Sequence, residues 1–219
     1  MDELAEKLAN YCERNFDLSK VSGYPYKSLS ICIIDCVYSL RAKYEAVTKP
    51  VVQRYADEFM QHNLSFENDT VSNLVDNIGR IGTENFATQI LKNAQRSGGV
   101  LKSEVCLTLA KYLKAIGIET IKDFQSFPEQ ELLEMIIASV KGIGNAGVNY
   151  LFMLAGDSNR CKPDVHIHHC IKDAIGIDVS DEQCQTLFQK ATQILKGKGF
   201  PNITVRDLDS TVWKYYESR

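Results

Sequence analysis

VKGIGNAGVNYLFMLAGDSNRCKPDVHIHHCI (residues 140–171) sets a Gly-Ile-Gly turn and an isolated acid, Asp164, at a fixed spacing. Before the turn, Phe127 to Ala138 has the apolar spacing of a helix, and Ser126 and Glu129 have the spacing of a capping box. After the turn, Ala146 to Leu154 predicts a second helix. Two helices joined by so short a glycine turn predict a helix-hairpin-helix motif.

The chemistry of this turn favours an anion. Gly142 and Gly144 can each adopt φ > 0, which lets other backbone approach closely, and Ile143 is expected to point inward. The amides at the start of the second helix then face outward, where they can bind a phosphate. The alternative is a helix C-cap and tight turn between two packed helices, because such glycine turns are common.

Asp164 follows a polar loop and opens a new apolar run. An acid in that place is either a functional carboxylate or only the N-cap of the next helix, where aspartate is a preferred residue.

GIGNAGVNYLFMLAG followed by KPDVHI resembles the helix-hairpin-helix DNA glycosylases of the endonuclease III superfamily, and the resemblance extends over about residues 28–176. It implies that Asp164 is the catalytic aspartate and that His166 matches the histidine two positions after it. It also implies a set of hairpin residues that bind DNA phosphate: Lys141, Gly142, Ile143, Gly144 and Ala146. Asn145 and His166 are the residues expected to support the site.

Two features of that family are missing. Its bifunctional members carry a Schiff-base lysine eighteen positions before the aspartate, and Ala146 stands there in this chain. Many members carry a four-cysteine iron–sulfur cluster near the C-terminus, whereas no cysteine follows Cys184. We therefore expect a monofunctional glycosylase with no iron–sulfur cluster and no other cofactor, although the hairpin can hold a monovalent cation.

In the resembled family, the loop after the first core helix supplies the residue that wedges into the duplex. That helix is expected at Ser28 to Arg41, which makes Leu40 and Arg41 the candidate wedges. The alternative is a core leucine beside a surface arginine. Asp35 interrupts the apolar run and is expected at an exposed or capped position on a thin polar face of the helix. The alternative is a buried acid, which would need a partner or a functional role.

Composition indicates an all-α protein. Of the 219 residues 44% are hydrophobic and 24% charged, proline is scarce, helical periodicity recurs, and no stretch of alternating β-branched residues appears. The net charge of −3 is not that of a basic nucleic-acid binder, so any DNA contact depends on local clusters. Those clusters are Lys92, Arg96 and Lys102 around Gly98-Gly99, and Lys141, Arg160 and Lys162 around the hairpin and the acid.

The chain has seven cysteines, an odd number, and the sequence shows no signal peptide or membrane-spanning stretch. We therefore expect the protein in the reducing cytoplasm, and in association with the nucleoid if the source is a prokaryote. Cysteine and histidine spacings around residues 161–184 match no common zinc pattern, so no metal site is expected.

The expected architecture is a two-lobed helical DNA glycosylase fold, with the hairpin on one rim of a cleft and Asp164 at its centre. One lobe is residues 25–159 and carries the helix-hairpin-helix motif at about 127–155. The other combines residues 1–24 and 160–219. Tyr24, Tyr26, Tyr38 and Tyr150 are candidates for stacking on a base.

The expected function is base-excision repair by a monomer that acts on double-stranded DNA containing a damaged or mismatched base. A non-catalytic helix-hairpin-helix DNA-binding protein is the first alternative. A helical protein-interaction domain is the second.

Overall fold

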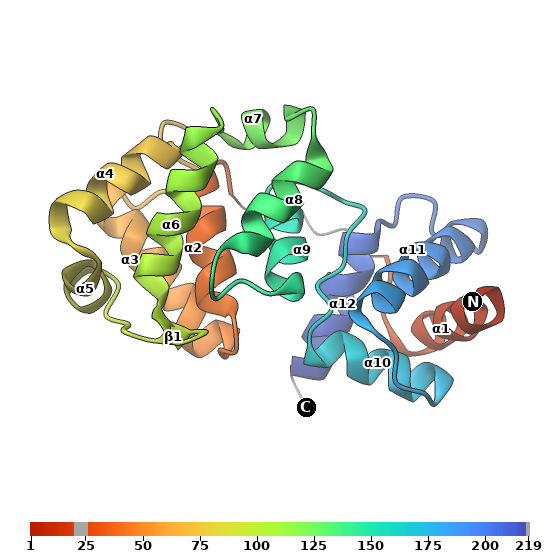
Figure 1. The fold of residues 1–219 in the computed structure, drawn as a ribbon. Coiled ribbons are helices and arrows are strands. Elements are labelled where there is room, and N and C mark those ends of the chain that lie inside the picture. The colour runs from red at the N-terminus through yellow and green to blue at the C-terminus, as the bar shows by residue number, and fades with distance from the viewer. Residues whose placement is uncertain (20–25, 218–219) are drawn as a thin grey trace. The chain divides into compact units, whose positions relative to one another are not determined.

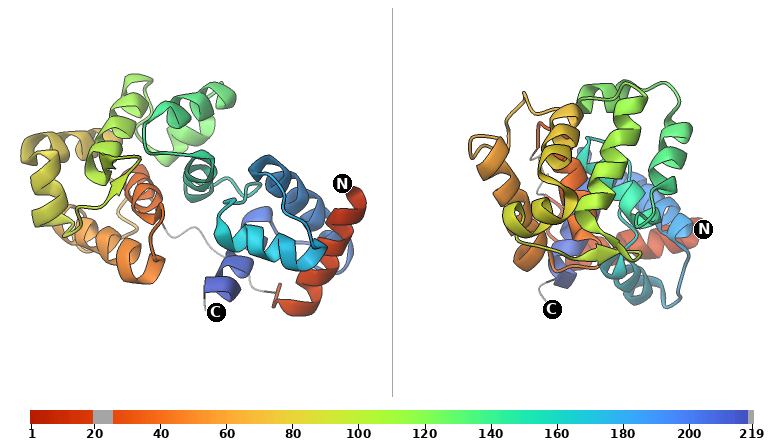
Figure 2. Two further views of the ribbon diagram at one scale, coloured as in Figure 1. Left: turned by 60° about the horizontal axis from the view of Figure 1, so that its bottom comes forward. Right: turned by 60° about the vertical axis from the view of Figure 1, so that its left-hand side comes forward.

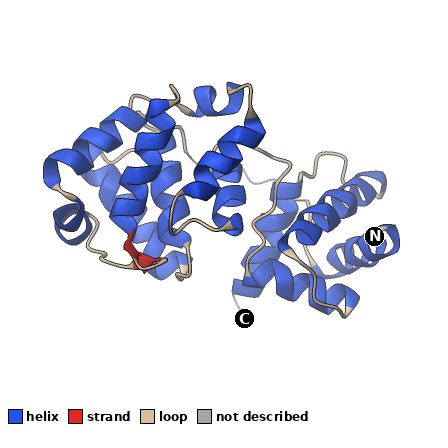
Figure 3. Cartoon of the chain, viewed as in Figure 1, coloured by secondary structure: helices blue, strands red, loops and turns tan. Residues whose placement is uncertain are grey.

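The computed structural model describes residues 1–19 and 26–217, and these residues are mostly helical. They form twelve α-helices, two short π-helical turns and one two-stranded hairpin (Figures 1 and 3). The prediction of an all-α protein is confirmed.

The chain divides into two compact units, and each is described here by itself. The terminal unit combines Met1–Gly23 with Asp157–Arg219, and the central unit is Tyr24–Gly156. The sequence placed the second boundary between residues 159 and 160, three residues later in the polar loop. The first boundary lies outside the described residues.

The central unit is built around α2 (Leu29–Ser39), all of whose residues are buried. Its nearly continuous apolar sequence leaves no wide polar face, so the helix is stable only when other helices surround it. α2 packs against α3, α4, α6 and α9 (Figure 1). The other elements of this unit are η1 (Tyr44–Thr48), α3 (Lys49–Phe59), α4 (Val71–Ile81), α5 (Thr83–Asn85), η2 (Phe86–Ile90), β1 (Arg96–Ser97), β2 (Val100–Leu101), α6 (Lys102–Ala115), α7 (Ile121–Ser126), α8 (Gln130–Ser139) and α9 (Asn145–Leu154).

Asp35 does not lie on an exposed polar face, and that expectation is wrong. Its carboxylate is fully buried in α2 and accepts hydrogen bonds from the hydroxyls of Tyr26 (2.7 Å), Tyr44 (2.8 Å) and Tyr150 (2.9 Å). Burial, together with the charge of Asp35, raises the pKa of Tyr150 far above its usual value, so its hydroxyl keeps its proton and donates. The acid therefore ties α2 to α9 and to the segments on either side of α2.

Three of the four tyrosines proposed for stacking on a base have hydrogen-bond partners in the central unit. Tyr26 and Tyr150 are held by Asp35, and Tyr38 is fully buried with its hydroxyl 3.5 Å from the carbonyl oxygen of Asn93. Tyr24 lies outside the described residues.

The terminal unit consists of α1 (Asp2–Asn15), α10 (Val165–Ile175), α11 (Asp181–Gly197) and α12 (Val205–Glu217). α1 packs on α10 and α11, and α12 packs on the same two helices (Figure 2). The predicted capping box Ser180–Gln183 begins α11. Thr204 and Asp207 make the equivalent reciprocal bonds before α12. The core of this unit is separate from that of the central unit.

Candidate functional site

As predicted, two helices of the central unit flank the glycine turn. α8 and α9 are joined by Val140–Gly144, and Ile143 points inward with 6% of its surface exposed. The amide of Ile143 donates to the carbonyl of Val140 at 3.0 Å, which closes the turn. Gly142 has φ +104°, a conformation that L-residues rarely adopt.

The β1–β2 hairpin supports this turn, and the sequence analysis did not predict it. Ser97 Oγ donates to the carbonyl oxygen of Gly142 at 2.7 Å. A Cβ on Gly142 would lie 2.9 Å from the Ser97 carbonyl oxygen and 3.1 Å from Cγ2 of Val105. Gly142 is therefore required both for its backbone conformation and for the close approach of the hairpin.

Gly144 is different, and the expectation of two conformationally special glycines is wrong for it. Its φ is −100°, it is exposed, and a Cβ would meet nothing within 4 Å. Gly144 is the N-cap of α9 and has no side chain with which to cap that helix. No steric contact at Gly144 requires a glycine, and its small size leaves space next to the N-terminus of α9.

The cations near the turn fall into two groups. Lys92, Arg96 and Lys141 are exposed and have no ion-pair partner among the described residues. Arg96 is held on the hairpin by a bond of 3.0 Å from Nη1 to the carbonyl of Gly99. These exposed cations form a locally positive surface near the turn, on a protein of net charge −3.

Lys102 does not belong to that surface. Its side chain is buried, and its ammonium donates to the carbonyls of Leu40 (2.8 Å) and Tyr38 (3.1 Å) and to Gln95 Oε1 (3.0 Å). The lysine thus caps the C-terminus of α2, where a cation is favourable. The inclusion of Lys102 in an exposed basic cluster is wrong.

The two wedge candidates occupy different environments in the loop after α2. Leu40 is half-buried, and its Cδ2 would lie 3.2 Å from a Cβ placed on Gly147 of α9. Arg41 is exposed and has φ +53°, which is uncommon for a residue with a side chain. Leu40 is thus engaged with α9, whereas Arg41 is presented to solvent from a loop that Lys102 holds in place.

Asp164 begins α10 in the terminal unit. Its Oδ1 accepts hydrogen bonds from the amides of His166 (3.0 Å) and Ile167 (3.3 Å), so the side chain is the N-cap of the helix. Oδ2 has no hydrogen-bond partner among the described residues, and the side chain is only partly buried. The N-cap interpretation accounts for one carboxylate oxygen and leaves the other available.

The residues around Asp164 come from α10 and α12. The ring of His166 packs edge-on against Trp213 with centroids 6.0 Å apart, so His166 contacts an aromatic side chain of α12. Asp209, also on α12, is buried with 6% of its surface exposed. Burial, aided by the negative charge of Asp164, raises the pKa of Asp209 to about 8. The sequence analysis did not identify Asp209.

The central unit contributes the remaining predicted residues. Asn145 is exposed, and its main-chain and side-chain oxygens both accept from the Asn149 amide at 3.2 and 3.3 Å. Ala146, at the position of the missing lysine, is half-buried in the first turn of α9.

A second group in the terminal unit has the composition of a nucleophilic site. His168 Nε2 lies 2.9 Å from Asp181 Oδ1, and Cys184 Sγ lies 3.5 Å from His168 Nδ1. Cys184 is fully buried, however, and burial raises its pKa to about 12, which is the reverse of what an activated thiol needs. This group is therefore structural.

All seven cysteines are free and buried, and the described residues contain no group of three or more potential metal ligands. No helix of the described chain is long and apolar enough to cross a membrane.

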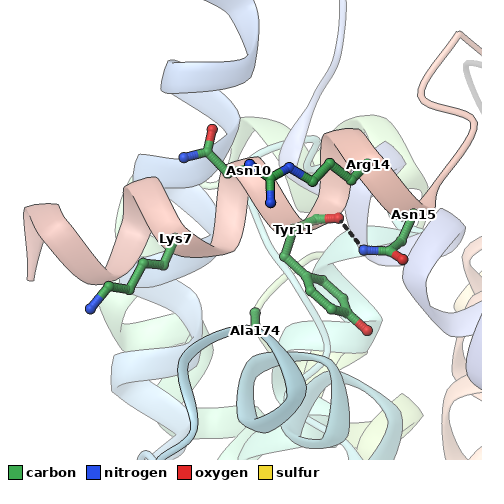
Figure 4. A pocket seen from close by; sticks show the side chains of 6 residues that line it. All are labelled: Lys7, Asn10, Tyr11, Arg14, Asn15 and Ala174. Carbon is green, nitrogen blue, oxygen red and sulfur yellow. Dashed lines mark hydrogen bonds between the residues drawn. The ribbon is translucent and has the colours of Figure 1, made fainter.

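A cavity of about 360 Å³ lies on the terminal unit away from Asp164 (Figure 4). It is lined by Lys7, Asn10, Tyr11, Arg14 and Asn15 of α1 and by Ala174 of α10. Lys7 is paired with Glu3 at 2.8 Å, and Asn15 bonds to the carbonyl of Tyr11. Five of the six lining residues belong to α1, so the cavity lies along that helix.

Comparison with known proteins defines the class to which this fold and site belong. The chain belongs to a family described as a domain of unknown function (DUF8548), whose family model matches residues 6–217. Searches of curated proteins and of solved structures found no match.

Proposed function

We propose that this protein is a monofunctional DNA glycosylase, which flips out a damaged or mispaired base and hydrolyses its N-glycosidic bond. The observation that carries the proposal is the state of Asp164: Oδ1 is fixed by two amides of α10, whereas Oδ2 has no partner in the described chain. A carboxylate that is held rigidly by one oxygen and offers the other is preorganised to act on a substrate. The resemblance of the surrounding motif to glycosylases supports DNA as the substrate class.

The reaction needs such a carboxylate. As the bond between C1′ and the base nitrogen breaks, positive charge develops on the deoxyribose, and the charge of Asp164 stabilises it. A water molecule then adds its oxygen to C1′, and Asp164 Oδ2 can accept one of its protons. The base leaves with the electron pair of the broken bond and takes up a proton. Because a base in the duplex stack is out of reach, the nucleotide must first be flipped out.

The hairpin turn supports DNA binding by the central unit. The N-terminus of α9 and the exposed Lys141 can hold phosphate oxygens, and Arg96 on the β-hairpin and Lys92 before it add positive charge nearby. Contacts of this kind bind the DNA backbone without reading sequence, and they weaken as salt concentration rises. Arg41 is the better presented of the two wedge candidates, because Leu40 is engaged with α9.

Ala146 supports a reaction that stops at base removal. Strand cleavage by the family's amine mechanism needs a lysine that attacks C1′ and forms a Schiff base. A methyl group occupies that register position. The product of this proposal is an intact strand with an abasic site, released by a cytoplasmic or nucleoid-associated monomer.

One observation favours a second function, a DNA-binding protein without chemistry. Asp164 is the N-cap of α10, which is a sufficient structural reason for an acid at this position. In that case the hairpin would bind duplex DNA and no base would be released.

A panel of duplexes, each with one uracil, oxidised pyrimidine, 8-oxoguanine, alkylated purine or mismatch, separates the two functions. Incubation followed by hot alkali converts any abasic site into a strand break. We expect breaks with at least one lesion and none without alkali. Duplex binding with no abasic site on any lesion of the panel would favour the DNA-binding protein.

A further inference from the structure

Asp209 is linked to Asp164 through the backbone between α9 and α10. Asp209 Oδ2 accepts a hydrogen bond of 2.8 Å from the amide of Lys162. The carbonyl of Lys162 in turn accepts a bond of 2.7 Å from the amide of Asp164. Two consecutive bonds therefore join a buried carboxyl of α12 to the residue that begins α10.

Resting on the proposed function, we propose that Asp209 is a positioning residue for Asp164, which it holds through the backbone of Lys162. The segment before α10 is otherwise a loop without regular structure. Its conformation determines where the free oxygen of Asp164 lies, and a catalytic carboxylate must be held to within about 0.5 Å. A hydrogen bond to a buried acceptor is suited to that task, because the carboxyl of Asp209 has little access to solvent.

The charge of Asp209 matters as much as its position. The charged groups that act on it are Asp164, Lys162 and Arg206. Cys161 is also close, and burial raises the pKa of its thiol, so the thiol stays neutral. Burial is the largest reason that the pKa of Asp209 rises to about 8, and the repulsion from Asp164 is the second. The Lys162 amide and the two cations oppose this rise without cancelling it.

At neutral pH the buried carboxyl of Asp209 is therefore mostly protonated. Above about pH 8 the buried carboxyl loses its proton beside a like charge, with only one hydrogen-bond donor to it among the described residues. Such an ion is costly unless the surrounding segment moves to solvate it. We therefore expect the Lys162–Asp164 segment to lose its geometry, and base release to fall, as pH rises through about 8.

The first test is the pH profile of single-turnover base release on a substrate that the wild type accepts. Asp209→Asn keeps an oxygen for the Lys162 amide but cannot ionise. The wild-type rate should fall about tenfold for each pH unit above the transition, and the variant should show no such fall, whatever its rate at pH 7. The same decline in both proteins would overturn the proposal.

Asp209→Leu removes the acceptor. Base release should then fall at every pH while duplex affinity stays within about twofold, since the hairpin lies in the central unit. Hydrogen exchange of the Lys162 amide, measured by NMR, should become faster by at least tenfold, which shows the lost bond directly. Unchanged exchange and unchanged release would contradict the assigned role.

A third measurement does not depend on enzymatic activity. The carboxyl resonance of Asp209, followed by NMR between pH 4 and 10, should titrate at a lower pH in Asp164→Asn than in the wild type, because the repelling charge is gone. If the wild type releases no base, the proposed function fails while this titration still decides whether the pair is coupled. An unchanged midpoint would refute the coupling even in an active enzyme.

Discussion

Gly142 and Gly144 test the account of the turn, because the structure requires a glycine at position 142 and tolerates a larger residue at position 144. At Gly142, with φ +104°, any other residue is strained, and a Cβ would lie 2.9 Å from the Ser97 carbonyl oxygen. Left-handed strain costs about 1–2 kcal/mol. Loss of the Ser97–Gly142 hydrogen bond adds about 1 kcal/mol. Gly142→Ala should therefore destabilise the protein by about 2–4 kcal/mol once the clash is included.

Gly144→Ala is the matched control, two positions away in the same turn. A methyl group there meets nothing within 4 Å, and φ −100° suits alanine. The weaker N-cap costs about 0.5 kcal/mol, and the reduced freedom of the unfolded chain offsets a similar amount. The free energy of unfolding should thus change by less than about 0.5 kcal/mol.

Urea unfolding followed by circular dichroism measures both free energies, and fluorescence anisotropy with a labelled duplex measures binding. We expect Gly142→Ala to lose stability, and Gly144→Ala to lose duplex affinity at unchanged stability, because its methyl group stands where a phosphate would approach. Equal destabilisation by both substitutions would refute the reasoning about the turn. Full duplex affinity in Gly144→Ala would refute the phosphate site at the start of α9.

Four further results are expected. The folded-state pKa of Asp209, about 8, lies above the ordinary 3.8, so the stability that this group contributes is present at low pH and is lost as pH rises to about 8. At about 1.4 kcal/mol per pH unit the loss is at most about 6 kcal/mol, so the advantage of Asp209→Asn over the wild type in urea unfolding should be larger at pH 9 than at pH 5. Asp35→Ala should cost about 3 kcal/mol in urea unfolding, since one buried and two partly buried tyrosine hydroxyls lose their acceptor. Lys102→Met should cost about 1–3 kcal/mol and increase hydrogen exchange in residues 38–43, because the carbonyls of Tyr38 and Leu40 lose their donor. Borohydride added during turnover should trap no covalent adduct with DNA, and an efficient adduct that disappears in Lys141→Ala or Lys162→Ala would show an amine mechanism.

Local sequence signals were sufficient for most of the helices. The apolar spacing predicted α2, α6 and α9, and the capping residues Ser180 and Thr204 mark the starts of α11 and α12 because their partners lie three residues away. The predicted capping box at Ser126 and Glu129 is wrong. Ser126 is the last residue of α7, and α8 begins at Gln130 without a side-chain cap. Ser126 and Glu129 therefore lie between two helices, one that ends at Ser126 and one that begins at Gln130.

The features that the sequence did not reveal depend on distant residues or on very short elements. Asp35 meets Tyr150 across 115 positions, so nothing near Asp35 shows that its charge is satisfied in the core. The β1–β2 hairpin has strands of two residues, too short for an alternating pattern, although Gly98-Gly99 is a typical hairpin turn.

Asp209 was missed for a related reason. The last helix contains both Asp207 and Asp209. Asp207 is bonded to the Thr204 cap, whereas Asp209 turns toward Lys162, and only the packing of α12 on α10 distinguishes the two.

The central claim is that the charge of Asp164 stabilises the transition state in which the N-glycosidic bond breaks. The most direct test is single-turnover base release by the wild type and by Asp164→Asn on the same lesion duplex. Asparagine is as good an N-cap as aspartate, so α10 and the fold are kept while the charge is lost. We predict that the rate falls by at least a hundredfold while lesion affinity and urea stability stay within about twofold and 1 kcal/mol. A variant that releases the base at the wild-type rate would contradict the account, as would a wild type that binds every duplex of the panel and releases no base.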